Sequence, residues 1–478
     1  MVLNLMSRLL SPEYFGLFMV IRRWVPVLIP LMTLNLSIGL TRYVGFDPDH
    51  SQAYLRTATV HISIVTFFFA LFFLVFRQTF SLLFFNDTRF AGVIPVLLLF
   101  FIANWVHLLV YGYYRGALQM QKANGLKILF TVFPILLLVA MLHSRPASDS
   151  GTIFLYFLLY SIWAIVTALF FLRQMIPPKV GTSTPKADKK SMKEFLLYSI
   201  ARIPAVFFDS LVYSLPVFMA NFKVSLAEAG YMGIVVVSIR FFEILSMPFT
   251  IIFLPKFSQL KRREDTEVIR DTSAVVVNFI ITFLPILIVT IPGLTRSLLL
   301  LWFGRAYLGI ADSLALAVLF SLFYVAFGLL RGILDGLYVF PFSSAIGFAG
   351  VVTIFVSSLL FRSDLYHLTL AFGLGLAVHG LLSLLVVFCK IRIPLRFKEV
   401  SISLVLTAII ACILPVIDPL LRRISGSESI ALLPMLGFRL FILAGVFFLF
   451  WRRLSWFQTL KQGSGIGTRV GNGGTPRG

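Results

Sequence analysis

Apolar segments long enough to cross a membrane recur along almost the whole chain. A helix needs about 20 predominantly apolar residues to span a hydrocarbon core of about 30 Å. Only 13% of the residues are charged and the mean hydropathy is +0.95, which is too apolar for a water-soluble core. The segments lack the alternation of a membrane barrel, so we predict helical spans. They lie at 14–40, 57–76, 93–114, 126–143, 152–172, 195–219, 229–254, 272–292, 311–332, 342–361, 367–389, 400–420 and 432–451. The first is long for one crossing, and Pro26 and Pro30 predict kinks in it.

The basic residues are spread among the loops and are not concentrated in one domain. A net charge of +21 would suggest nucleic acid in a soluble protein. Here the positive-inside rule accounts for most of it, so nucleic acid is not an expected partner. Lys and Arg are more frequent in alternate loops beginning with 41–56, in the linker 173–193 and in the tail. We therefore expect the linker and the C-terminus to be cytoplasmic.

A nine-residue segment occurs twice, as Tyr111–Gln119 and as Phe327–Asp335. Its glycines, Gly112 and Gly328, lie 216 residues apart. Earlier in each half, further residues match at an offset of 214, in the same order: Ser11 with Ser225, Gly16 with Gly230, and Arg42 with Lys256. Several ordered matches predict two like halves.

The repeat predicts that the first half lacks most of its first helix. The counterpart of 195–219 would lie before Met1, so we expect a misassigned start or a truncated chain. With that helix restored, each half has six spans, and the halves form parallel repeats about an axis along the membrane normal. The expected organisation is an N-terminal lobe at 1–172, a cytoplasmic basic linker at 173–193, a C-terminal lobe at 194–390, two additional transmembrane helices at 391–452 and a disordered cytoplasmic tail at 453–478.

Four short stretches, in order, are similar to motifs of one transporter group. Leu9–Leu17 resembles the opening signature L-[SG]-P-E-x-[FY]-G, and the others are Tyr114–Gln119, Gly230–Tyr231 and Leu254–Lys256. Together they resemble the polysaccharide and oligosaccharidyl-lipid flippases (O-antigen-type translocases) of the multidrug/oligosaccharidyl-lipid/polysaccharide exporter superfamily. The resemblance covers nearly the whole chain. It implies an all-α membrane protein with fourteen helices in two MATE-like lobes, in which the first helix, missing here, lines the central cavity. It also implies that lipid-linked saccharides are flipped to the periplasmic leaflet.

Five arginines fall within the predicted spans, where each costs roughly 2.5–3.5 kcal/mol at a helix centre. They are Arg22, Arg23, Arg202, Arg240 and Arg439. The repeat maps Arg240 onto position 26, one helical turn after Arg22, so the two halves are expected to carry arginine at similar depth. Arg439 lies near a helix end and is expected to snorkel to the surface.

Two interpretations of these charges stay open. In the first, a cationic cavity holds the phosphates of a lipid carrier, because guanidinium binds phosphate oxygens in a bidentate fork. Its substrate-binding residues are Arg22, Arg23, Arg240 and Arg202. In the second, Arg240–Glu243 and Arg202–Asp209 are internal ion pairs on single helix faces. Asp209 and Glu243 are also candidates for ion coupling by proton uptake.

Other polar residues in or beside the spans have expected roles too. Asn104 and His107 are expected to form interhelical hydrogen bonds or to contact a sugar. Arg115 and Arg331 lie beside glycines at helix ends and are expected to be loop anchors or gate elements.

The sequence favours a flippase for an undecaprenyl-pyrophosphate-linked oligosaccharide, working by alternating access in the bacterial inner membrane for surface polysaccharide biosynthesis. Its expected partners are that anionic lipid and the surrounding membrane lipids, with a polysaccharide polymerase and ligase as candidate protein partners. We expect no enzyme activity, metal or cofactor, because no nucleophile–base set or framed nucleotide loop is found. The alternatives are a multidrug/cation antiporter of the same superfamily, a membrane glycosyltransferase or polysaccharide polymerase, and a flippase-like scaffold without transport.

Overall fold

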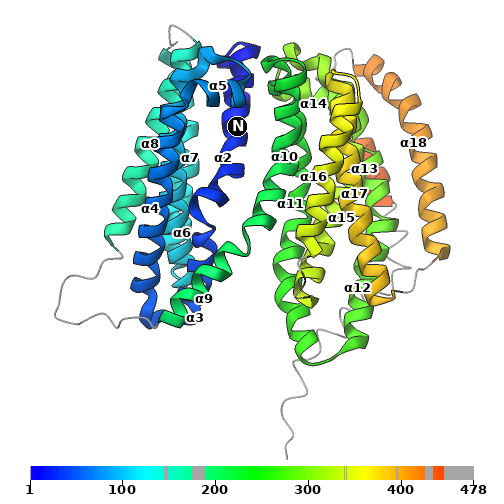
Figure 1. Cartoon of the computed structure of the whole chain (residues 1–478). Helices are drawn as coiled ribbons and strands as arrows, with labels where there is room; N and C mark the ends of the chain where they lie inside the picture. Colours follow the sequence, from blue (N-terminus) through cyan, green and yellow to red (C-terminus); the bar gives the residue numbers. More distant parts are fainter. Residues whose placement is uncertain are drawn as a thin grey trace, which may run out of the picture.

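The computed structural model describes residues 2–144, 149–174, 189–338, 340, 342–393, 397–425 and 434–445. Over these residues the chain is helical and contains no strand. Eleven helical stretches in this part are long and apolar enough to cross a membrane. The predicted class, an all-α membrane protein with two lobes, is confirmed (Figure 1). The expected tail at 453–478 lies outside the described residues, as does most of the linker.

The first bundle, blue to cyan in Figure 1, is built by the N-terminal half of the chain. Its helices are α1 (Val2–Leu9), α2 (Pro12–Thr33), α3 (Leu36–Phe46), α4 (Ser51–Val75), α5 (Arg77–Phe85), α6 (Ile94–Gly116), α7 (Met120–Ser144) and α8 (Asp149–Arg173). The short 3-10 helices η1 (Pro48–His50) and η2 (Thr88–Val93) connect neighbouring helices.

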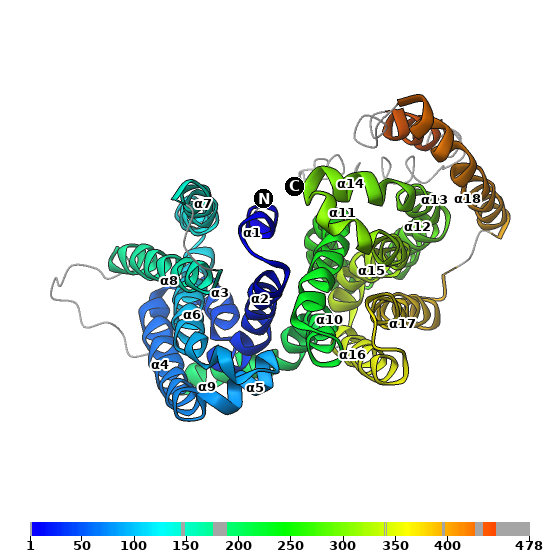
Figure 2. The same ribbon diagram turned by 90° about the horizontal axis from the view of Figure 1, so that it is seen from above.

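The second bundle, green to yellow, follows the linker. Its helices are α10 (Ile203–Lys223), α11 (Leu226–Arg262), α12 (Thr266–Thr282), α13 (Leu284–Val289), α14 (Thr295–Trp302), α15 (Ala311–Leu337), α16 (Phe342–Leu360) and α17 (Leu365–Ile391), with 3-10 helices η3 (Pro292–Leu294) and η4 (Arg305–Ile310). Helix α18 (Phe397–Ser425) lies at the outer edge of this bundle (Figure 2) and is followed by a short helix, Pro434–Gly445.

Three predicted single spans are each broken into two helices, and one of them, 272–292, is α12 followed by α13. The predicted span 14–40 continues through Pro26 and Pro30 and ends at Thr33, because Leu34 and Asn35 take φ of 49° and 52°. Such left-handed backbone cannot continue a right-handed helix. The predicted span 195–219 is α9 (Lys189–Ile200) followed by α10, with Ala201 and Arg202 in a turn between them. Helix α9 packs on α3 of the first bundle, so this break joins the two lobes.

The internal repeat is visible in matching hydrogen bonds. Thr41 Oγ1 donates to the Gly112 carbonyl at 3.0 Å, and Thr250 Oγ1 donates to the Gly328 carbonyl at 2.6 Å. The equivalence of the two glycines therefore holds in three dimensions. The predicted match of Arg42 with Lys256 does not, because packing pairs Thr41 with Thr250, at an offset of 209 and not 214.

Helix α2 forms the junction between the lobes by packing on α10 and α11 (Figure 2). The Trp24 ring stacks on Phe84 of its own lobe at 4.2 Å and on Phe218 of the other lobe at 4.1 Å. The Tyr307 hydroxyl donates to the carbonyl of Ser7 at 3.3 Å. These contacts involve α1 and the part of α2 up to Trp24.

Candidate functional site

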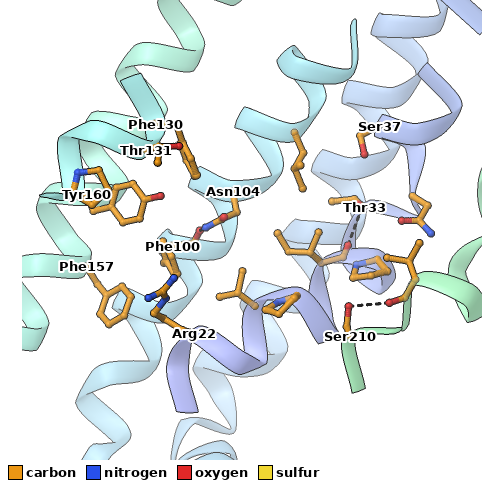
Figure 3. Close-up of a pocket in the computed structure, with 18 of the residues that line it drawn as sticks. Arg22, Thr33, Ser37, Phe100, Asn104, Phe130, Thr131, Phe157, Tyr160 and Ser210 are labelled. Atoms are coloured by element: carbon orange, nitrogen blue, oxygen red, sulfur yellow. Dashed lines mark hydrogen bonds between the residues drawn. The ribbon is translucent and has the colours of Figure 1, made fainter. Parts of the chain in front are cut away.

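A cavity of about 570 Å³ opens beside α2 on the N-terminal side of the junction (Figure 3). Helices α1, α2, α3, α6, α7 and α8 supply most of its lining, and α10 adds two residues. Its polar side chains include Arg22, Thr33, Asn35, Ser37, Asn104, Thr131, Tyr156, Tyr160 and Ser210. Its volume lies within the range of small-molecule sites.

Arg22 is the only charged residue among the described residues that line this cavity. Its guanidinium lies 5.5 Å from the centroid of the Phe18 ring, and in the described part of the chain no carboxylate forms an ion pair with it. Figure 3 shows Arg22 extending from α2 into the space near Asn104 and Phe157. The side chain is exposed, so its hydrogen-bond donors remain available to a ligand.

The broken end of α2 supplies a second polar group to the cavity wall. Asn35 lies in the break, and its Nδ2 is buried without a hydrogen-bond partner among the described residues. Asn104 Nδ2 donates to the Phe100 carbonyl of its own helix at 2.7 Å. A ligand with hydroxyl or carbonyl oxygens can accept from Asn35, which is a typical way to satisfy a buried donor.

Arg23 points away from the cavity into the junction between the lobes. The side chain is only 5% exposed, and its Nη2 has no hydrogen-bond partner among the described residues. The Ser214 hydroxyl of α10 donates to the Arg23 carbonyl at 3.1 Å, which fixes this turn of α2. Arg23 is close enough to interact electrostatically with Arg240 and Tyr213.

Arg240 and Glu243 are neighbours on α11. The Arg240 Nε lies 3.5 Å from Glu243 Oε2, and its guanidinium lies 4.7 Å from the centroid of the Tyr213 ring. Arg240 does not line the described cavity. The predicted pairing with Glu243 is therefore present, while Arg23 and Arg240 place two positive charges at one junction.

The predicted pairing of Arg202 with Asp209 is wrong. Arg202 stands before α10 at its N-cap, so the spacing of seven residues does not place the two side chains on one helix face. Asp209 instead accepts from Arg331 Nη1 at 2.6 Å. Arg331 also lies 3.4 Å from Asp335, so it belongs to an internal network of α10 and α15 and is not a loop anchor.

Two other predictions are also corrected. Arg439 was expected to reach the surface, but it is 2% exposed and pairs with Asp418 of α18 while donating to the Thr290 carbonyl. The expected interhelical hydrogen bonds of Asn104 and His107 are absent among the described residues. The Asn104 amide bonds within α6, and the His107 ring stacks on Phe130 at 3.8 Å with Nδ1 unpaired.

No protein-family profile matches this chain, and no curated protein matches its sequence. Several solved structures match its fold. An inward-facing multidrug resistance transporter of the MATE family, in the MOP superfamily, matches with a TM-score of 0.67 at 11% identity, covering 82% of this chain and 93% of that one. The lipid II flippase MurJ in an inward closed conformation matches with a TM-score of 0.69 at 12% identity, covering 95% and 97%. A MATE structure in a bent conformation matches with 0.52 at 13% identity, covering 82% and 97%. The chain therefore shares the two-lobe fold of these proteins.

Proposed function

We propose that this chain is a transporter that flips a lipid-linked oligosaccharide across the membrane, holding the pyrophosphate of the lipid carrier at Arg22. One observation carries the proposal: Arg22 projects into a cavity of about 570 Å³ and has no acidic partner among the described residues. A guanidinium in that setting favours an anion, and its fork geometry suits phosphate oxygens.

The rest of the cavity suits a saccharide. Tyr156, Phe157 and Tyr160 offer aromatic faces, while Asn35 and Asn104 offer amide groups. Sugar rings combine apolar faces with hydroxyl groups, so mixed walls of this kind suit them. Arg23 and Arg240 would add positive potential near the junction that the substrate must pass. Arg202 is not part of this proposed site, because it does not line the cavity.

Alternating access would follow from the two-lobe fold. In this structure α1 and the part of α2 up to Trp24 contact the second lobe, and they begin at the end that the charge distribution predicts to be periplasmic. Two of the similar solved structures are in inward-facing and inward closed conformations. The proposed location is the bacterial inner membrane with a cytoplasmic C-terminus, and a polysaccharide polymerase and ligase are proposed partners.

A multidrug/cation antiporter is the second candidate, because MATE transporters share the fold. Recognition of a cation requires an acidic or electron-rich site. No carboxylate is found among the described residues that line the cavity, and Asp209 already forms an ion pair with Arg331. The charge of the cavity therefore favours an anionic substrate.

The experiment is a flipping assay in proteoliposomes. The substrate is an undecaprenyl-pyrophosphate that carries a fluorescent disaccharide, and a membrane-impermeant quencher reports its leaflet. We expect the wild-type chain to accelerate flipping and Arg22→Ala to reduce the rate at least about tenfold, the effect of one lost charge-assisted hydrogen bond. Arg22→Lys should retain part of the rate, because lysine keeps the charge without the fork.

The matched control is Arg77→Ala. Arg77 is an exposed arginine on α5, outside the cavity, and its removal should leave the rate unchanged. Equal rates for Arg22→Ala and the wild type would overturn the proposal. Transport of a cationic dye by the wild type, without flipping of the lipid, would support the antiporter instead.

A further inference from the structure

Two arginines share one tyrosine ring where the lobes are joined. The guanidinium of Arg42, on α3, lies 4.3 Å from the centroid of the Tyr198 ring, and that of Arg202 lies 4.3 Å from the same centroid. Tyr198 belongs to α9, and Arg202 precedes α10. The two guanidinium carbons are thus no more than twice this distance apart.

Their charges are not neutralised within the described chain. No ion pair there joins Arg42 or Arg202 to a carboxylate, although Glu194 lies one helical turn before Tyr198. Both arginines are exposed. A cation–π contact uses the flat face of a guanidinium and leaves its N–H groups free at the edge. Two such edges within this span can donate to one phosphate group, at about 2.8 Å for each hydrogen bond.

The start of α10 adds to the positive potential. This helix has 21 residues, and its first turn begins directly after Arg202. Helix N-termini carry unpaired N–H groups and a partial positive charge, which favour phosphate. The positive end of this helix lies directly after Arg202 in the chain.

Helix α9 changes from charged to apolar along its length. Its first turns expose Lys189, Lys190 and Lys193, whereas Leu197 and Ile200 near its end are 56% and 43% exposed. Lysines at headgroup level with apolar side chains below them are typical of interfacial helices. The arginine pair follows directly after these exposed apolar residues, so an anionic lipid is the ligand class that would contact both.

We propose that Arg42, Arg202 and the Tyr198 ring that both guanidiniums contact form a binding site for the phosphate group of an anionic lipid headgroup. The site lies outside the cavity of Arg22, and the proposal does not depend on which substrate the cavity carries. The ligand would bridge α3 of the first lobe and the turn that leads into α10 of the second. Its binding would thus hold this turn against the first lobe and favour the arrangement seen here.

The test measures retained lipid by native mass spectrometry. The full-length chain is delipidated and then titrated with phosphatidylglycerol or with phosphatidylcholine. We expect one phosphatidylglycerol to bind preferentially, and Arg42→Ala or Arg202→Ala to weaken it by about tenfold. The double variant should be little weaker than either single one, because the two guanidiniums share one phosphate. Tyr198→Leu should weaken binding, while Tyr198→Phe, which keeps the ring, should not.

Arg115→Ala is the matched control, because Arg115 is also exposed and lies 5.6 Å from a tyrosine ring, that of Tyr111. It should bind phosphatidylglycerol like the wild type. If inorganic phosphate displaces phosphatidylglycerol, the same site also accepts free phosphate as its ligand. If it does not, the lipid is the ligand. Unchanged phosphatidylglycerol binding in the Arg42→Ala/Arg202→Ala variant would overturn the proposal, as would an equal loss in Arg115→Ala.

Discussion

Gly16 and Gly230, which the internal repeat makes equivalent, contact each other across the junction of the two lobes. A Cβ added to Gly230 would lie 3.1 Å from the backbone nitrogen of Gly16 and 3.2 Å from its Cα. A Cβ added to Gly16 would overlap the carbonyl oxygen of Leu226. The lobes therefore meet backbone to backbone at a point that both halves supply, and the pseudo-axis passes near these glycines.

Gly16→Ala should force the lobes apart at this end. Backbone atoms cannot rotate away as a side chain can, so we expect a cost of about 1–3 kcal/mol to this arrangement. Spin labels at Leu82→Cys on α5 and Leu298→Cys on α14, in a Cys389→Ser/Cys412→Ser background, report the separation by pulsed electron resonance. The distance distribution should shift to longer values. Gly92→Ala is the control, because nothing lies within 4 Å of its added Cβ. An unshifted distribution in Gly16→Ala would contradict the close approach.

Asp209→Asn should destabilise the second lobe. It leaves Arg331, whose side chain is 30% exposed, with the 3.4 Å contact to Asp335 as its one remaining ion pair among the described residues. We expect a loss of about 1–3 kcal/mol in the free energy of unfolding, as for other hydrogen bonds to charged groups. Glu243→Gln provides the comparison, because its ion pair with Arg240 is longer and more exposed and should contribute at most about 1 kcal/mol. Thermal unfolding in detergent measures both variants, and equal losses would refute this ranking.

Arg439→Met should detach the helices that follow α17. The Arg439 side chain is buried and holds both Asp418 and the Thr290 carbonyl, so its loss leaves an uncompensated buried carboxylate. Such a break typically costs about 3–5 kcal/mol. The double variant Arg439→Met/Asp418→Leu should recover much of this, because neither charge remains. Limited proteolysis after α17 checks both, and a double variant no more resistant than the single one would argue against a charge-based docking.

Asp47 should make stability depend on pH. Its carboxylate accepts from His50 Nδ1 at 2.9 Å and from the Tyr54 hydroxyl at 3.0 Å. The hydrogen bond from His50 holds the pKa of Asp47 below its ordinary value of 3.8. A lowered pKa means that the stabilisation is complete above the ordinary value and is lost as the pH falls through the pKa of the folded state. Asp47→Asn should therefore melt below the wild type at pH 7, and the difference should narrow as the pH falls below 3.8. Asp49→Asn, a neighbouring exposed carboxylate, should match the wild type throughout, and a difference for Asp47→Asn that stays constant as the pH falls would count against this role.

The fold class and the repeat could be predicted because both depend on local sequence. Twenty apolar residues specify a membrane helix whatever their neighbours. The glycines at 112 and 328 allow close helix packing, which their shared segment already suggested. The positions of the helix breaks were harder to predict from the sequence. Leu34 takes a positive φ that its residue type disfavours, so only tertiary packing can place a break there.

The candidate site was predicted less completely, because its partners come from distant segments. Arg22 lines the cavity as a candidate should, but the partner of Asp209 lies 122 residues away on α15. The spacing of seven residues predicted Arg202 as the partner of Asp209. This prediction was wrong because Arg202 lies outside the helix. Asn35 could have been noticed only as a polar residue inside an apolar span.

The matching hydrogen bonds of Thr41 and Thr250 show that the halves have diverged in length. Gly16 and Thr41 are 25 residues apart, whereas Gly230 and Thr250 are 20 apart. The extra residues accompany the break at Leu34–Asn35, whose flanks Thr33 and Ser37 line the cavity, while α11 runs unbroken. The two lobes thus share one fold, but the cavity is built mainly by the first lobe. A bound molecule would contact that lobe more than the other, so its binding energy would act asymmetrically and favour rotation of one lobe relative to the other. A ligand bound on the pseudo-axis would contact both lobes equally and would not.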